Sequence, residues 1–385
     1  MSRLDPVLVD SVRSRLALQR LAVDAQTISS AVRASGLVLD RPGLEELTRA
    51  LQDELGGLGP LDLLLRDPEV TDVLVNAPQE VWLDRGGGLV RAPVSFPDEA
   101  SVRQLAVRLA ARAGRRLDDA TPYVDARLPG GQRLHAVVPP LSVRGTTISL
   151  RIPSRRRFTL TDLVTAGTVD ADGARWLAAL VESRAAFLVS GGTGSGKTSV
   201  LGALLGLVPA RERIVVVEDT CELDPAHPHV VSLESRPANL EGQGEIPMRT
   251  LVRQALRMRP DRLVVGEVRG AEVVDLLAAM NTGHEGGCGT IHANSAGAVP
   301  DRVAALALAA GMTLAGVHAQ ISAGLDFVVH LARRPEGSRV VAEIGVITAE
   351  GSGTYVRPAL VRHAGSLRPE PEGFARLSER LEGRL

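Results

Sequence analysis

The sequence predicts an α/β protein with two domains, a parallel α/β core preceded by a smaller α+β domain. The chain has 385 residues, which is long for one domain. After residue 160, apolar strand-like segments alternate with helical ones, as in parallel sheets covered by helices. A glycine-rich segment at residues 189–200 contains Lys197, the only lysine among 44 Lys and Arg residues. This lysine suggests a site that arginine cannot serve.

The first 43 residues form the predicted N-terminal helical extension. Apolar residues at helical spacing predict one amphipathic helix over residues 1–36, which Gly36 would end. Packing is the simplest role for such a helix. A helix that binds a partner or a membrane surface is the alternative.

Residues 44–152 form the predicted α+β domain. Helices are expected at residues 43–55 and 99–114. Strands are expected at residues 70–76 and 80–84 around a turn at Pro78, and a hairpin turn follows at Asp84. Two more strands are expected within residues 131–140 and 146–152.

A short linker at residues 153–160, with three consecutive arginines from Arg155 to Arg157, separates this domain from residues 161–385. The second domain begins with a predicted helix at residues 174–184. Its tail from Leu367 is predicted to be a linker broken by prolines and then a short charged helix. Buried strands are expected at residues 185–190, 213–218, 229–234, 262–267 and 288–293.

The amino-acid composition limits the classes of partner and site that this protein can have. The net charge of -1 and an aromatic content of 2% argue against a stable nucleic-acid partner, which would need basic surface and stacking platforms. Two cysteines, Cys221 and Cys288, are too few for a four-thiolate zinc site. The longest apolar run, at residues 303–317, is shorter than the ~20 residues of a membrane span. We expect a cytoplasmic protein.

The segment around Lys197 fits the phosphate-binding pattern G-x-x-x-x-G-K-[ST], with a strand before it and a helix after it. Glycines let the backbone wrap around phosphate oxygens, and the helix N-terminus adds partial positive charge. A compact ammonium fits inside such a loop where a planar guanidinium would not. Thr198 is expected to bind Mg²⁺. The expected nucleotide-binding residues are Gly191, Gly192, Thr193, Gly194, Ser195, Gly196, Lys197, Thr198 and Ser199.

The single lysine also excludes competing classes. A guanine-recognition motif of the type N-K-x-D needs a second lysine, so a GTPase with this motif is excluded. A protein kinase needs a further lysine together with H-R-D and D-F-G segments, and these are absent from the sequence.

Carboxylates follow two of the predicted buried strands. Glu218 and Asp219, with Glu222 nearby, follow one strand, and Glu267 ends another. Carboxylates at the ends of parallel strands can hold Mg²⁺ or polarise an attacking water molecule. The plain alternatives are a turn cap for Glu218 or Asp219 and an ion pair with Arg269 for Glu267.

Beyond these motifs, the chain resembles the traffic ATPases of secretion and pilus assembly, and within them the Tad/Flp (tight adherence) pilus branch. The resemblance covers residues 45–330. It is carried by SGGTGSGKTSVLGALL, VVVEDTCEL, LVRQALRMRPDRLVVGEVRG and AAMNTGHEGGCGTIHANS, and in the first domain by GLGPLDLLLRDPEVTDVLVNAPQEVWLD, GGQRLHAVVPPLS and ISLRI.

The resemblance implies a RecA-like P-loop ATPase core after a PAS-like first domain, assembled as a homo-hexamer that uses ATP and Mg²⁺. It implies that Glu267 is the catalytic glutamate and that Glu218 belongs to the family's Asp box, which supports the metal and water, with Asp219 and Glu222 as further candidates. The family's His box corresponds to His284 and His292. The family's phosphate-reaching arginines correspond to Arg133 and Arg151, for which ion pairs on a sheet surface are the alternative.

The same resemblance implies a partner, an inner-membrane platform protein of a pilus or secretion system. The chain would then lie at the inner face of the cytoplasmic membrane and contact the membrane only through that partner. Two other functions stay open: a type IV secretion ATPase for conjugation or effectors, and a scaffold that binds nucleotide but hydrolyses it weakly. A metal site formed by His284, Cys288 and His292 is a further alternative, disfavoured by the intervening glycines.

Overall fold

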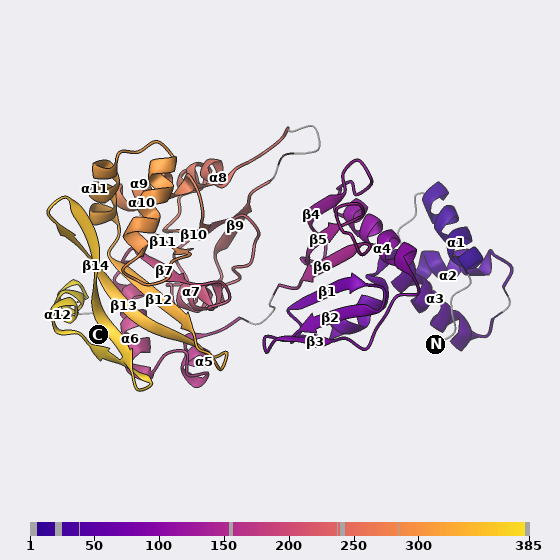
Figure 1. The fold of residues 1–385 in the computed structure, drawn as a ribbon, viewed down its shortest axis with the longest axis horizontal. Helices are drawn as coiled ribbons and strands as arrows, with labels where there is room; N and C mark the ends of the chain where they lie inside the picture. The colour runs from indigo at the N-terminus through magenta and orange to yellow at the C-terminus, as the bar shows by residue number, and fades with distance from the viewer. Residues whose placement is uncertain are drawn as a thin grey trace. The chain divides into compact units, whose positions relative to one another are not determined.

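The computed structural model describes residues 6–19, 25–37, 39–153, 157–236, 238, 243–283 and 285–381. The chain divides into two compact units, Met1–Arg155 and Arg156–Leu385. Both sequence-predicted sheets are present, one in each unit (Figure 1). No helix among the described residues is long and apolar enough to cross a membrane.

The first unit begins with three helices rather than the single helix predicted over residues 1–36. These are α1 (Pro6–Gln19), α2 (Ala25–Arg33) and α3 (Arg41–Gly56). Val12 of α1 and Ile28 of α2 are buried in one apolar cluster with Leu51 of α3. A single helix of 36 residues would be about 54 Å long and could not bury both halves against the 16-residue α3.

The first unit also contains a six-stranded antiparallel sheet in the order β3-β2-β1-β6-β5-β4. Helix α4 packs its apolar side, with Leu105 and Leu109, into one core with Val73, Val81 and Leu134 of the sheet. Strand β4 was not predicted from the sequence. The elements are η1 (Gly59–Arg66, a 3₁₀ helix), β1 (Asp72–Ala77), β2 (Glu80–Asp84), β3 (Leu89–Arg91), α4 (Glu99–Arg112), β4 (Tyr123–Arg127), β5 (Arg133–Val137) and β6 (Thr147–Arg151).

The second unit is built on a nine-stranded sheet in the order β15-β14-β13-β12-β7-β11-β10-β8-β9. Strands β12, β7, β11, β10, β8 and β9 pair in parallel, as the sequence predicts for the core. The strands are β7 (Phe187–Gly191), β8 (Ile214–Glu218), β9 (Val230–Glu234), β10 (Arg262–Val268), β11 (Cys288–Ile291), β12 (Phe327–Arg333), β13 (Arg339–Glu350), β14 (Gly353–His363) and β15 (Ser366–Pro369).

Helices cover both faces of this sheet (Figure 1). On one face, Leu177 and Leu201 share a core with Val189 and Val329. On the other face, Leu276 packs in the core that contains Leu188. The helices are α5 (Leu160–Thr165), α6 (Ala171–Glu182), α7 (Lys197–Leu205), α8 (Met248–Ala255), η2 (Leu256–Met258, a 3₁₀ turn), α9 (Glu272–Asn281), α10 (Val299–Ala309), α11 (Leu314–Gly324) and α12 (Pro371–Arg380).

The C-terminal part differs from the sequence prediction. Residues 366–369, predicted as a linker, form β15 and pair antiparallel with β14. Leu367 is buried there in the core of the unit, which explains why this proline-flanked segment is a strand. The predicted charged helix is present as α12, and its Phe374 ring meets Trp176 of α6 edge to face at 5.2 Å between ring centroids.

Candidate active site

The nucleotide-binding candidate lies where β7 ends and α7 begins. The chain turns between them through Gly191, Gly194 and Gly196, whose φ angles of 149°, 70° and 94° are disfavoured for residues with a Cβ. Gly196 precedes the first residue of α7, so the loop leads directly into a helix N-terminus. The loop has the backbone geometry and the helix end that phosphate groups require.

Lys197 is 8% exposed, and its ammonium lies inside the loop. Its Nζ donates to the carbonyl oxygens of Gly191 at 3.1 Å and Gly192 at 3.0 Å. Burial lowers the pKa of Lys197, while the charge of Glu267 opposes that shift. The enclosed position agrees with the use of lysine where every other cationic residue is arginine.

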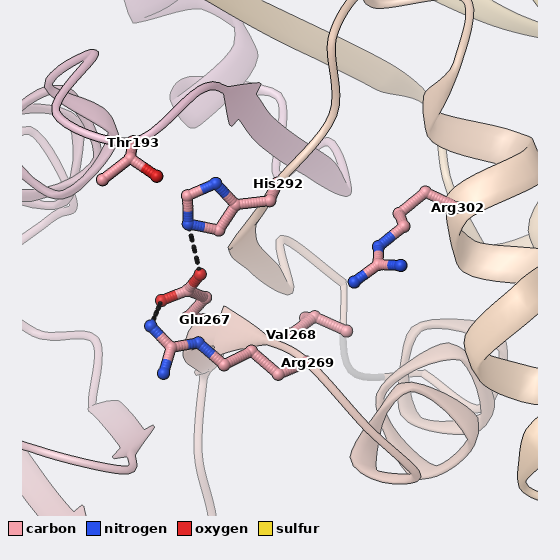
Figure 2. Close-up of a pocket in the computed structure, with 6 residues that line it drawn as sticks. All are labelled: Thr193, Glu267, Val268, Arg269, His292 and Arg302. Carbon is pink, nitrogen blue, oxygen red and sulfur yellow. Dashed lines mark hydrogen bonds and ion pairs between the residues drawn. The ribbon is translucent and has the colours of Figure 1, made fainter.

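Glu267 lies near the carboxyl end of β10, and two side chains contact its carboxylate (Figure 2). Its Oε1 lies 2.7 Å from Nε2 of His292, and its Oε2 accepts a hydrogen bond from Arg269. The ion pair with Arg269, the plain alternative for Glu267, is therefore present. The structure also brings Glu267 together with His292 from the end of β11.

His292 connects Glu267 to the loop, since both of its ring nitrogens lie 3.5 Å from Nζ of Lys197. Burial and the nearby Lys197 lower the pKa of His292, which favours the neutral ring. A neutral imidazole can donate one hydrogen bond and accept another. A proton on Nε2, which faces Glu267, leaves Nδ1 as an acceptor for the Lys197 ammonium or a water molecule.

A pocket of about 350 Å³ opens beside this pair. Arg302 reaches toward it from α10 (Figure 2), and sequence reasoning missed this residue. The available signal was its position ten residues after His292, in the helix that follows the strand. The lining residues are Thr193, Glu267, Val268, Arg269, His292 and Arg302.

Glu218 ends β8 and is 3% exposed. Its Oε1 accepts backbone N–H groups of Glu222 at 3.2 Å and Leu223 at 3.1 Å, and burial raises its pKa to about 7. The turn-cap alternative for Glu218 is thus observed. A Cβ on Gly266 would lie 2.3 Å from Cγ of Glu218. Gly266, the residue before Glu267, therefore leaves the space that the Glu218 side chain occupies.

The residues expected to support Mg²⁺ do not form a complete ligand cage. Asp219 is exposed and accepts a hydrogen bond from Ser235 at 3.1 Å. Within the part of the chain that the structure describes, no group of three His, Cys, Asp or Glu side chains could hold a metal ion. This arrangement fits Mg²⁺, which commonly takes one or two protein ligands and completes its shell with phosphate and water. Thr198, in the first turn of α7, would supply a hydroxyl.

The described part of the segment between the predicted histidines runs from the amino end of β10 to the carboxyl end of β11. His284 itself lies outside the described residues. Gly286 packs against the Arg262 guanidinium at the amino end of β10, whereas His292 lies at the carboxyl end of β11. Burial raises the pKa of Cys288 to about 12, and a protonated thiol between them disfavours a metal site.

Arg133 and Arg151 lie in the first unit as register neighbours on β5 and β6. Arg127 of β4 pairs in register with Arg133, which places three arginines in one row across the sheet. Sequence reasoning missed Arg127 because β4 was not predicted. Arg133 also pairs with Asp125 at 2.7 Å, the ion-pair alternative, and a role toward phosphate stays a prediction.

A phosphate-binding loop after β7, with a carboxylate on β10, the next strand but one in the sheet, defines the site of a P-loop nucleotide-binding protein. A model of the family described as Type II/IV secretion system protein matches residues 54–358, and the chain belongs to this family. A putative conjugal transfer protein of Mycobacterium tuberculosis strain H37Rv is 54% identical over 323 residues, which are 82% of this chain and 91% of that protein.

Conjugal transfer protein TrbB of Rhizobium radiobacter is 34% identical over 299 residues, which are 76% of this chain and 88% of that protein. Among solved structures, the ATPase DotB of Legionella pneumophila aligns with a TM-score of 0.54. The alignment has 18% identity and covers 74% of this chain and 80% of DotB, so it bears on the fold alone. The predicted fold class, an ATPase-type α/β core after a smaller domain, is confirmed.

The family match and the named relatives support the secretion family as a whole and do not single out the Tad/Flp branch. The relatives named above are conjugal transfer proteins, which favours the alternative of a type IV secretion protein over the pilus branch.

Proposed function

We propose that this chain is a Mg²⁺-dependent ATPase that powers a type IV secretion system of the conjugal-transfer kind. The observation that carries the proposal is the 2.7 Å contact between Glu267 and His292, whose ring lies 3.5 Å from the loop lysine. These three groups come from three neighbouring segments that end at one edge of the sheet. Ligand chemistry in parallel sheets gathers at this edge.

In the proposed reaction, the loop amides and Lys197 hold the phosphates of ATP. On binding, the Lys197 ammonium exchanges its contacts with Gly191 and Gly192 for phosphate oxygens. Glu267 releases Arg269, orients the attacking water molecule and accepts a proton from it. His292 holds the second carboxylate oxygen and fixes its direction. A bound Mg²⁺ would neutralise charge on the phosphates, with Thr198 as its ligand.

The cellular proposal follows from the family and its named relatives. We propose a homo-hexamer that works at the inner face of the cytoplasmic membrane, where it passes the motion of hydrolysis to a membrane platform protein. The chain would contact the membrane only through this partner. The net charge of -1 and the low aromatic content suggest that the motor acts on proteins and does not bind DNA directly.

The same charge argument favours one second candidate, a motor for a Tad/Flp-type pilus whose cargo is protein. A host strain lacking the gene, complemented with the wild type or Glu267→Gln, separates the two. Loss of DNA transfer with intact surface pili supports the conjugal proposal, and the reverse supports the pilus motor. A strain in which Glu267→Gln restores both processes would instead indicate a scaffold that needs no hydrolysis.

A further inference from the structure

Outside the residues assigned above, a second element of the same unit contacts the nucleotide-binding loop. Strand β12 runs parallel to β7, with His330 in register with Ser190 and Leu331 in register with Gly191. Ser190 and His330 are 0% and 9% exposed. The Ser190 hydroxyl and Nδ1 of His330 form a hydrogen bond of 2.9 Å, which ties the residue before the loop to β12.

The next residue of β12 reaches the loop through its backbone. A Cβ on Gly191 would lie 2.5 Å from the carbonyl oxygen of Leu331, so the two backbones pass in close contact. Gly191 is also one of the two residues whose carbonyl oxygen accepts the Lys197 ammonium. β12 therefore restricts the loop at the point where the lysine is anchored.

β13, the strand next to β12 in the sheet, also contacts this loop. Arg339, the first residue of β13, donates from Nε to the carbonyl oxygen of Gly194 at 3.0 Å. Its Cδ lies 3.2 Å from the position a Cβ on Gly196 would take. A peptide group is planar, so fixing the Gly194 carbonyl also fixes the direction of the Ser195 amide.

These contacts act on a segment that is costly to order. Three glycines of the loop have positive φ angles, and glycine loses more conformational freedom on ordering than any other residue. From these contacts we propose that the β12–β13 hairpin braces the nucleotide-binding loop, with His330 and Arg339 as positioning residues that set nucleotide affinity. The inference rests on the proposed nucleotide site and goes beyond it, because neither residue needs to touch the reacting atoms.

Binding of ADP to the full chain, followed by isothermal titration, tests this brace. His330→Ala removes the contact to Ser190, and His330→Asn retains a polar group at the position of Nδ1. Arg339→Met keeps the aliphatic stem over Gly196 and removes the donor to Gly194. Arg368→Met, an exposed substitution on β15, is the matched control.

We expect His330→Ala and Arg339→Met each to raise the Kd for ADP about three- to tenfold, as expected for one lost hydrogen bond. His330→Asn should recover most of that loss, and Arg368→Met should match the wild type. In ATP turnover, KM should rise while kcat at saturation stays within about twofold. Amides of residues 191–196 should exchange hydrogen faster in His330→Ala and in Arg339→Met than in the wild type.

Variants that fold with wild-type melting temperatures and bind ADP as the wild type does would overturn the brace. A fall in kcat without a change in Kd would also overturn it. If His330→Ala does not fold, Arg339→Met and His330→Asn still decide the question. A wild type that binds no nucleotide would refute the proposed function itself, which is a different result from equal binding by all variants.

Discussion

At the scale of single residues, the site depends on close approaches that only particular side chains permit. Lys197 lies inside its own loop, and Glu218 lies against the bare Cα of Gly266. The sequence pattern predicted that the Lys197 loop, Glu218 and Glu267 lie at the ends of parallel strands, because strand ends and a glycine-rich loop are visible in the sequence, but it missed Arg302. It could not show that Glu218 turns into its own loop and away from solvent, since the contacts of that carboxylate depend on the local turn.

Replacement of Lys197 by arginine should not preserve nucleotide binding. The ammonium lies about 3 Å from two loop carbonyl oxygens in a space that a planar guanidinium exceeds. We expect Lys197→Arg and Lys197→Ala to weaken ATP binding alike, each by at least about tenfold. Equilibrium titration measures this effect, and near-normal affinity in Lys197→Arg would show that the loop does not enclose its cation.

The glycine before Glu267 should be intolerant of a methyl group. In Gly266→Ala the new Cβ would lie 2.3 Å from Cγ of Glu218, and overpacking of this kind costs about 1–3 kcal/mol. For a unit of this size we expect a fall in melting temperature of about 2–4 °C per kcal/mol, with loss of ATP turnover. Gly297→Ala, where the nearest atom lies 4.0 Å away, is the control and should melt like the wild type.

At the scale of elements, five of the six parallel strands of the second sheet could be predicted from the sequence, whereas β12, the antiparallel strands of that sheet and β4 of the first sheet could not. Strands β7, β8, β10 and β11 are short apolar runs, the usual signature of strands buried on both faces. β4 and β15 carry alternating or proline-flanked residues and are strands because their partners supply hydrogen bonds and burial. Long-range pairing of this kind leaves little local signal.

The hairpin of β12 and β13 gives a stability prediction that depends on pH. Glu343 lies opposite His330 in the hairpin register, and burial raises the pKa of its carboxyl above the ordinary 4.5. At pH values between the unfolded-state pKa of 4.5 and the raised folded-state pKa, the Glu343 carboxyl is protonated in the folded state and ionised in the unfolded state. The stabilisation is therefore complete below about pH 4.5 and is lost as the pH rises through the folded-state value.

Glu343→Gln removes this titration. Between about pH 5 and pH 8, we expect the melting temperature of the wild type to fall more than that of the variant, by about 2–4 °C for each kcal/mol of linkage. Glu379→Gln, at an exposed position of α12, is the control, and its melting temperature should depend on pH as that of the wild type does. Parallel pH profiles for the wild type and Glu343→Gln would mean that this carboxyl titrates normally.

At the scale of the whole molecule, the family resemblance implies a role toward phosphate for arginines of the first unit, and this role stays a prediction. The arginine row of β4, β5 and β6 is the candidate for that role. Arg133→Gln and Arg151→Gln should each lower ATP turnover by at least about tenfold, because a guanidinium stabilises charge that develops on the phosphates. Binding of ADP should change by less than about twofold.

Arg66→Gln in the η1 turn is the control for these substitutions and should leave turnover unchanged. Turnover that survives the loss of both Arg133 and Arg151 would restrict the first unit to a structural role. The ion pair between Arg133 and Asp125 would then be the explanation for that residue.

The measurement that tests the central claim most directly is steady-state ATP hydrolysis against protein concentration, with mass followed by light scattering, for wild type and Glu267→Gln. The account predicts that activity per chain rises as a six-subunit species forms. It predicts that Glu267→Gln assembles and binds ATP but loses at least about a hundredfold in turnover. Equal activity in both proteins, or activity independent of assembly, would contradict the claim that Glu267 activates water within a ring-shaped motor.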